Sequence, residues 1–204
     1  MNEQDVPSPI DFKDSVDAQE WERTAQARPG RPEIFRAFAT ELRAITSSQL
    51  DVLELGSGPG FLATYLLQEM PNIRMRLLDF SAAMHNLARK RLGKDVDRVQ
   101  FVERNLKEPG WEQGLGTFNA VITNQAVHEL RHKKYAVGLH SLVKGLLRPG
   151  GIYLVSDHFF GEGGLKNDQL YMTVAEQQES LVKAGFASVR QAAAAGSLVM
   201  HYAT

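Results

Sequence analysis

Short, mostly apolar runs alternate with amphipathic segments along most of the chain. The runs at 50–55, 73–78, 99–102, 120–123 and 152–155 have the length and composition of buried strands. Between them lie longer segments in which apolar residues recur at helical spacing. This alternation predicts an α/β fold with a doubly wound, mostly parallel sheet and helices on both of its faces.

Further elements are predicted at both ends of this pattern. Pro32 opens a segment with apolar residues on one helical face. These residues are Ile34, Phe35, Phe38, Ala39, Leu42 and Ile45. Toward the other end, Thr173 and Glu176 form the capping-box sequence of a final helix. The segments 186–190 and 198–202 then predict two strands, so the sheet has seven strands and ends in an antiparallel hairpin.

Length and composition predict a single domain. With 204 residues and 43% hydrophobic content, the chain can bury one substantial core, so we expect residues 1–204 to form one domain. Residues 1–30 are mostly polar and contain Pro7, Pro9 and Pro29. We expect them to form a lid over the site, while residues 31–204 form the core with its leading helix.

The composition also excludes several partners and chemistries. A net charge of -1 gives no overall attraction to a phosphate backbone, so a small-molecule substrate is favoured and no nucleic acid is expected. No apolar run approaches the roughly 20 residues of a membrane span, and the first five residues are polar and acidic. We therefore expect a cytoplasmic protein with no membrane contact. The absence of cysteine excludes disulfides, thiolate metal sites and cysteine nucleophiles.

The segment 52–60, Val-Leu-Glu-Leu-Gly-Ser-Gly-Pro-Gly, joins a predicted strand to a glycine-rich turn. Its alternating glycines, Gly56, Gly58 and Gly60, let the backbone turn tightly and approach a ligand more closely than a Cβ atom would permit. One β-α unit later, Asp79 ends the second strand, where a carboxylate can accept hydrogen bonds from a ribose diol. The segment therefore predicts a ligand that contains a nucleotide.

The spacing of the glycines separates two classes of cofactor. A dinucleotide-binding G-x-G-x-x-G pattern requires glycine at position 61, where this chain has Phe61. Glu54 precedes the first glycine, and a carboxylate there is poorly placed beside a pyrophosphate but well placed near a cation. S-adenosylmethionine carries both a sulfonium and an ammonium group. The segment 52–60 and Asp79 resemble motif I of the class I S-adenosylmethionine-dependent methyltransferases.

This resemblance extends from about residue 50 to the C-terminus and includes the Leu-Arg-Pro-Gly-Gly turn at 147–151. It implies a Rossmann-like core that transfers a methyl group from S-adenosylmethionine to a small-molecule acceptor by in-line displacement, which leaves S-adenosylhomocysteine. The family usually has aspartate where this chain has Asn105, whose side-chain carbonyl can accept the same hydrogen bond from adenine. The implied cofactor-binding residues are Glu54, Gly56, Ser57, Gly58, Gly60, Asp79, Phe80, Asn105, Leu106 and Asn124.

The segment after the fourth predicted strand contains the candidate catalytic residues. The family often places a histidine here, facing the reactive methyl group, which implies His128 as the general base and Glu129 as a second candidate. The Asn-Pro-Pro-Tyr signature of many enzymes that methylate nucleobase or glutamine nitrogens is absent at 124–127. Asn124 and Asp157 alone are too few for the metal cluster of the catechol-type enzymes, so we expect no metal.

Three other interpretations of these residues stay open. The segment 128–132 matches H-E-x-x-H, and on a helix its two histidines would share a face and could bind zinc, as in a metalloprotease. The extended metzincin pattern fails at Tyr135 and Gly138, where glycine and histidine are required. A second alternative is a non-catalytic module that binds S-adenosylmethionine, and a third is that His128 only bonds nearby backbone.

Aromatic residues near the N-terminus and in loops are candidates for the wall of an apolar acceptor pocket. They are Phe12, Trp21, Phe159, Phe160 and Tyr171. Ordinary packing is an equally good explanation of such residues. The sequence determines neither the acceptor nor the oligomeric state.

Overall fold

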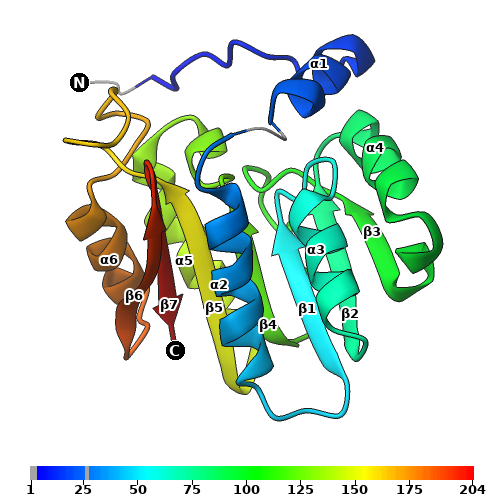
Figure 1. Cartoon of the computed structure of the whole chain (residues 1–204). Helices are drawn as coiled ribbons and strands as arrows, with labels where there is room; N and C mark the ends of the chain where they lie inside the picture. The colour runs from blue at the N-terminus through cyan, green and yellow to red at the C-terminus, as the bar shows by residue number, and fades with distance from the viewer. Residues whose placement is uncertain (1–3, 26–27) are drawn as a thin grey trace.

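The computed structural model describes residues 4–25 and 28–204, in which seven strands form one sheet in the order β3-β2-β1-β4-β5-β7-β6 (Figure 1). The strands are β1 (Leu50–Leu55), β2 (Ile73–Asp79), β3 (Val99–Glu103), β4 (Phe118–Asn124), β5 (Leu147–His158), β6 (Val189–Ala195) and β7 (Leu198–Ala203). The strands β1 to β5 are parallel, whereas β7 is antiparallel to both β5 and β6. The predicted mostly parallel sheet with its C-terminal antiparallel hairpin is confirmed.

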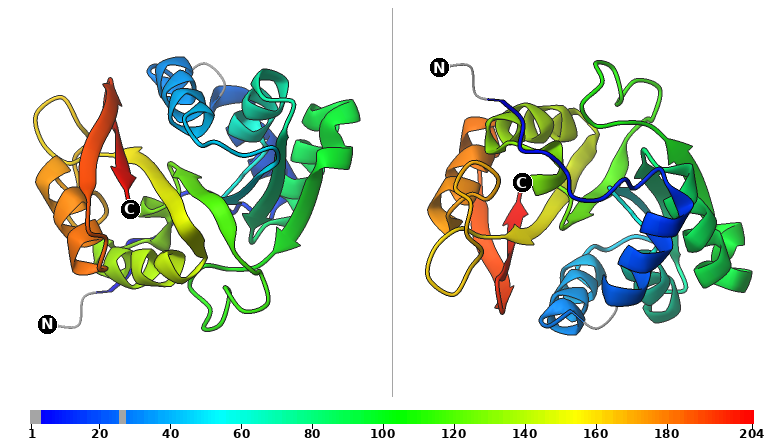
Figure 2. Two further views of the ribbon diagram at one scale, coloured as in Figure 1. Left: turned by 90° about the horizontal axis from the view of Figure 1, so that it is seen from below. Right: turned by 90° about the horizontal axis from the view of Figure 1, so that it is seen from above.

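Helices cover both faces of this sheet, as predicted (Figure 2). The α-helices are α1 (Ser15–Ala25), α2 (Arg31–Arg43), α3 (Phe61–Glu69), α4 (Ala82–Leu92), α5 (Ala136–Gly145) and α6 (Val174–Lys183). Short 3-10 helices are η1 (Gly93–Arg98), η2 (His128–Leu130) and η3 (Lys133–Tyr135). Phe38 of α2 and Leu66 of α3 belong to the apolar core on one face, and Leu139 of α5 and Leu181 of α6 to the core on the other.

Local signals in the sequence set several helix ends. The Ser81 hydroxyl accepts a hydrogen bond from the backbone N–H of Met84 at 3.0 Å and caps α4. The capping box of Thr173 and Glu176 is present at the start of α6. Gly93 adopts a φ of 54° and ends α4. These signals act over three or four residues, so the surrounding fold does not override them.

Two elements differ from the sequence prediction. The strand expected at 186–190 begins later and runs further, as β6 (Val189–Ala195). Phe186 lies before this strand and stacks on Tyr153, with ring centroids 5.6 Å apart. The alanine run at 192–195 has low strand propensity but pairs with β7 all the same. The helix α1 was not predicted, since it buries only Ala18 and Ala25 among its own residues.

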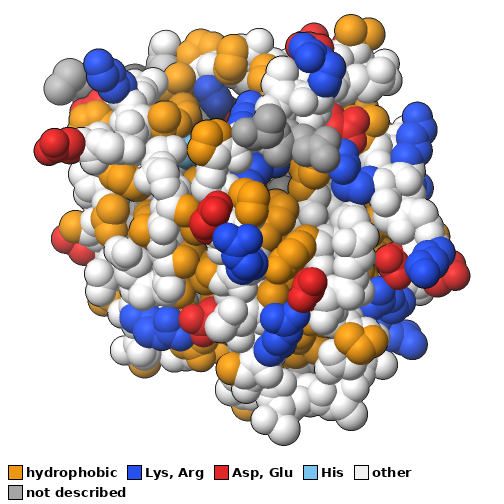
Figure 3. Space-filling model, viewed as in Figure 1, with side chains coloured by type: hydrophobic (Ala, Val, Ile, Leu, Met, Phe, Trp, Pro, Cys, Tyr) orange, Lys and Arg blue, Asp and Glu red, His pale blue; other side chains and the backbone are white. Residues whose placement is uncertain are grey.

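The carboxyl ends of the parallel strands meet at one edge of the sheet, and the N-terminal segment with α1 crosses above this edge (Figure 1). Residues 1–3 and 26–27 of the expected lid lie outside the described residues. On the face drawn in Figure 3, both signs of charge are spread over the surface, and Lys and Arg side chains lie near the hollow at its upper centre. Within the described residues, no helix is long and apolar enough to span a membrane.

Candidate functional site

A cavity of about 220 Å³ opens at the carboxyl edge of the sheet. Its walls come from the loops that follow β1, β2, β3 and β4 and from the N-terminal segment. Nearly all of the residues proposed from the sequence line it together: Glu54, Gly56, Ser57, Gly58, Asp79, Phe80, Asn105, Leu106, Asn124, His128 and Glu129. Gly60 is outside this lining, and its missing side chain leaves room for Ala88 of α4, whose Cβ lies 3.1 Å from the place a Cβ would take.

The glycine loop between β1 and α3 depends on backbone geometry that a side chain would disturb. Gly56 has a φ of 64°, and a Cβ atom added there would lie 2.4 Å from the Cβ of Ala126. Gly58 also has a positive φ, 52°, but faces open space. Only glycine adopts such conformations at little cost. The loop therefore exposes backbone to the cavity where other residues would place side chains.

Asp79, the last residue of β2, anchors this loop. One carboxylate oxygen accepts a hydrogen bond from the backbone N–H of Gly58 at 2.8 Å, and the other accepts one from Ser81 at 2.9 Å. Burial raises the pKa of Asp79 to about 6, and the backbone hydrogen bonds oppose a larger rise. Each oxygen keeps acceptor capacity for a ligand hydroxyl.

Five cavity-lining side chains have a buried polar atom without a hydrogen-bond partner among the described residues. The atoms are Nη1 of Arg31, Oε2 of Glu54, Oγ of Ser57, Oδ1 of Asn124 and Nε2 of Gln125. Each buried polar group left unpaired costs about 1 to 3 kcal/mol. Their gathering around one cavity therefore indicates a polar ligand that satisfies them.

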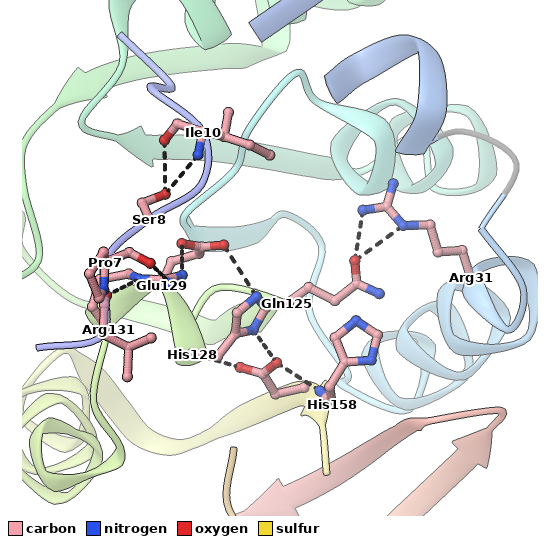
Figure 4. Close-up of polar contacts among 11 residues, drawn as sticks. Pro7, Ser8, Ile10, Arg31, Gln125, His128, Glu129, Arg131 and His158 are labelled. Carbon is pink, nitrogen blue, oxygen red and sulfur yellow. Dashed lines mark hydrogen bonds and ion pairs between the residues drawn. The ribbon is translucent and has the colours of Figure 1, made fainter. Parts of the chain in front are cut away.

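These unpartnered atoms are of two chemical kinds. Glu54 and Asn124 offer acceptor oxygens, whereas Arg31 and Gln125 offer donors. Arg31 also donates from Nε and Nη2 to the side-chain oxygen of Gln125, at 3.3 and 2.7 Å (Figure 4). Burial, followed by the charge of Asp79, raises the pKa of Glu54 well above its usual value. A cation beside Glu54 and a carboxylate beside Arg31 would fit this arrangement.

His128 lies between two carboxylates in η2 (Figure 4). Its Nδ1 atom is 2.5 Å from an oxygen of Asp157, the penultimate residue of β5, and its Nε2 atom is 3.3 Å from an oxygen of Glu129. Glu129 in turn accepts a hydrogen bond from Arg131 at 3.0 Å. Burial alone would lower the pKa of His128, but the charge of Asp157 outweighs it and raises the pKa to about 10. The imidazole is therefore protonated at neutral pH and bonds carboxylates rather than only backbone.

The H-E-x-x-H segment does not form the helix that a zinc site requires. The helix η2 ends at Leu130, Arg131 adopts a φ of 68°, and His132 is extended. His132 accepts a hydrogen bond from the backbone N–H of Lys134 at 3.0 Å. Across 4–25 and 28–204, no three His, Cys, Asp or Glu side chains gather in a group that could hold a metal ion. The metalloprotease interpretation is wrong because its two histidines do not share a helical face.

The N-terminal segment contributes aromatic side chains to the cavity. Phe12 and Trp21 line it, and the ring of Phe12 makes edge contacts with Phe80 and Trp21 at centroid distances of 6.4 and 5.8 Å. Tyr171 contacts the ring of His128 at 5.3 Å. Of the aromatic candidates from the sequence, Phe159, Phe160 and Tyr171 do not belong to the cavity lining.

Arg31 and Gln125 were not among the site residues predicted from the sequence, and no sequence pattern linked Asp157 with His128. A usable signal existed for Arg31, because a cation in the first turn opposes the helix dipole and suggests a role other than helix stability. Asp157 lies one residue before the end of β5, at the same edge as Asp79 and Asn124. For Gln125, the sequence offered no signal other than its position directly after β4.

A family model described as a methyltransferase domain matches residues 52–151. Among curated proteins, the malonyl-[acyl-carrier protein] O-methyltransferase of Paenibacillus sp. (strain JDR-2) is 21% identical over 156 residues, which are 68% of this chain and 55% of that protein. The non-reducing polyketide synthase ausA of Emericella nidulans is 29% identical over 112 residues, which are 52% of this chain and 4% of the synthase. The chain thus spans about half or less of the length of these curated relatives.

Solved structures with the same fold cover nearly the whole chain. An O-methyltransferase family protein from Burkholderia thailandensis superposes with a TM-score of 0.74 at 18% identity, over 95% of this chain and 61% of that one. The complex of DhpI with SAH superposes with a TM-score of 0.68 at 22% identity, over 93% and 92% of the two chains. At these identities the likenesses show a shared fold, which covers more than nine-tenths of this chain.

Proposed function

Because residues 52–151 match the methyltransferase-domain model, we propose that the chain is a class I methyltransferase that transfers a methyl group from S-adenosylmethionine to a small-molecule acceptor by in-line displacement. The observation that carries this proposal is the set of unpartnered polar atoms around the cavity, split into acceptors and donors. That split fits the neighbouring ammonium and carboxylate groups of the cofactor. When bound, S-adenosylmethionine supplies a methyl group on a sulfonium, which is already an activated leaving group.

Individual residues fit the cofactor as follows. Glu54 and Asn124 accept hydrogen bonds from the ammonium, and Arg31 with Gln125 donates to the carboxylate. Asp79 accepts from the ribose hydroxyls while it continues to hold Gly58. Phe80 and Leu106 flank the adenine, and Asn105 accepts from its amino group. The backbone of Gly56 and Gly58, together with Ser57, borders the methionine part.

His128 and Glu129 are the catalytic candidates in this proposal. Both line the cavity, and the acceptor must lose a proton if it is a hydroxyl or an ammonium. Asp157 positions the ring of His128, which can act as a base once its own proton has left. Glu129 lies at the other ring nitrogen and is the second group able to receive the proton. This ionisable pair at the cavity supports catalysis rather than a module that only binds the cofactor.

Residues 1–30 are proposed to act as a lid over the reacting groups. Val6 supports this role, since its backbone accepts a hydrogen bond from Arg131 at 2.9 Å, beside Glu129. A lid excludes water from the methyl group, and alignment with exclusion of water is the main task of an enzyme whose leaving group is already activated. A cytoplasmic location, expected from the sequence, stays a prediction.

Ligand binding tests the proposed function directly. S-adenosylhomocysteine at about 100 times its dissociation constant should stabilise the fold by roughly 2.7 kcal/mol, which is measurable as a rise in melting temperature. Asp79→Ala should weaken S-adenosylhomocysteine binding by roughly 10- to 100-fold, because a charged acceptor is lost. Asp168→Ala, at an exposed position outside the cavity, is the matched control. A melting-temperature shift with NAD and none with either S-adenosyl compound would refute the proposal.

A further inference from the structure

Two guanidinium groups at the cavity have no acidic partner in the described part of the chain. Arg28 and Arg31 both line it, and both lie over the ring of Trp21, with centroid distances of 5.1 and 5.5 Å. Arg31 is only 6% exposed, and its Nη1 atom has no hydrogen-bond partner among the described residues. Within the same residues, neither arginine forms an ion pair with a carboxylate. The charges of these two arginines are therefore not paired with a carboxylate of the described protein.

The other basic residues of the cavity differ in this respect. Arg104 donates to the backbone carbonyls of Trp111 and Gln113 at 2.6 and 2.7 Å. Lys107 forms an ion pair with Asp5. Their positive groups are already occupied by the protein itself. Arg28 and Arg31 are left as the groups that a ligand can neutralise.

The two arginines also repel each other. Burial, followed by the charges of Arg28 and Arg91, lowers the pKa of Arg31 to about 10. The proposed function accounts for one anion, the cofactor carboxylate beside Arg31 and Gln125. In the proposed function Glu54 pairs with the cofactor ammonium, so Glu54 does not compensate Arg28. The acceptor is the remaining ligand of the site, and a negative group on it would pair with Arg28.

Arg28 lines the same cavity as His128, the catalytic candidate that the acceptor must face. The rings of His128, His158 and Tyr171 form one cluster, with centroid distances from 5.3 to 6.1 Å. Burial lowers the pKa of His158 to about 4, and the charges of Arg28 and Arg31 add to this effect. The positive charge thus acts on the aromatic cluster around the catalytic candidate.

We propose that the methyl acceptor carries a carboxylate, which binds Arg28 while its methyl-accepting atom faces His128; this rests on the proposed methyl transfer. An acid of this kind gives Arg28 the carboxylate partner that it lacks among the described residues. Its apolar part packs against Trp21 and the ring of His128, which both line the cavity. The carboxylate also holds the acceptor at one end, so the orientation of the reacting atom is restricted.

The test uses the full chain saturated with S-adenosylhomocysteine and two probes of nearly equal shape, phenylacetate and its neutral amide. Calorimetry or ligand-observed NMR measures both dissociation constants. We expect the acid to bind at least 10-fold more tightly than the amide to the wild type, because a charge-assisted pair forms with Arg28. Arg28→Gln should reduce this preference to about one, with S-adenosylhomocysteine affinity unchanged. Arg23→Gln, an exposed position on α1, should keep the preference.

Three outcomes would overturn the inference: equal binding of acid and amide, binding of neither probe, or a loss of S-adenosylhomocysteine affinity in Arg28→Gln as large as in Arg31→Gln. The last result would assign Arg28 to the cofactor carboxylate instead. The preceding titration of the wild type with S-adenosylhomocysteine tests the proposed function separately. Tight cofactor binding without any preference for the acid would refute the proposal of a carboxylate-bearing acceptor. The proposed methyl transfer would be unaffected.

Discussion

The Nδ1 atom of His128 lies 2.5 Å from one carboxylate oxygen of Asp157, and the backbone N–H of His128 donates to the other oxygen at 2.9 Å. The second bond holds the start of η2 against the end of β5, and the first sets the orientation of the imidazole. Because β4 and β5 are neighbouring parallel strands, their following residues meet at the same edge. The pair therefore joins the catalytic candidate to the rigid sheet.

This pair predicts the pH dependence of methyl transfer. The pKa of His128 is raised to about 10, so the neutral, proton-accepting imidazole becomes more abundant as the pH rises toward that value. If His128 is the base, kcat should increase with pH over this range, and Asp157→Asn should move the increase to lower pH. His128→Ala should lower kcat by roughly 10² to 10⁴ while S-adenosylhomocysteine affinity is kept. Asp168→Asn serves as control, and an unchanged rate in His128→Ala would exclude the catalytic role.

The two glycines of the loop should differ in their tolerance of alanine. Gly58→Ala places a Cβ atom in open space and costs only the left-handed conformation, about 1 to 2 kcal/mol of unfolding free energy. Gly56→Ala adds a clash with the Cβ of Ala126 at 2.4 Å, and overpacking of this kind costs roughly a further 1 to 3 kcal/mol. Urea unfolding of the two variants measures the difference. Equal losses would show that the steric argument at Gly56 is wrong.

The lid should be visible in hydrogen exchange. Arg131 donates to the backbone carbonyls of Val6 and Pro7 at 2.9 and 2.7 Å, so Arg131→Gln should speed amide exchange in residues 5–10. In the wild type, S-adenosylhomocysteine should slow exchange over residues 5–25. Lys183→Gln, an exposed position on α6, should leave the N-terminal segment unchanged. Identical exchange with and without ligand would contradict a lid.

His201 of β7 predicts a loss of stability in acid. The side chain is fully buried, neither ring nitrogen has a partner among the described residues, and burial lowers its pKa to about 4. The unfolded chain, with a pKa near 6.5, takes up this proton first, so stability falls as the pH drops from about 6.5 to 4. His201→Leu should remove this dependence. The free energy of unfolding of the variant relative to the wild type should therefore be on the order of 2 kcal/mol higher at pH 5 than at pH 7.5. Urea unfolding at both pH values checks it, and parallel pH profiles for the two proteins would count against it.

The sequence by itself determined the sheet, the glycine loop and most of the cofactor edge. The alternation of apolar runs depends on the period of strands and helices. The positive φ of Gly56 and the cap at Ser81 are likewise determined within a few residues. Such signals are local, so they are readable without the fold. Asp79 and Asn124 line one cavity because parallel strands bring their carboxyl ends to one edge, which the sequence pattern already implied.

Only the tertiary structure decided which side chains meet. Arg31 and Gln125 are 94 positions apart, and His128 and Asp157 are 29 apart, so no local pattern connects either pair. The same reason explains the failed zinc motif. The letters of H-E-x-x-H are present, but η2 ends at Leu130 and Arg131 takes a left-handed conformation that lets it bond the N-terminal segment. Packing between distant segments, rather than local propensity, set the chemistry of this site.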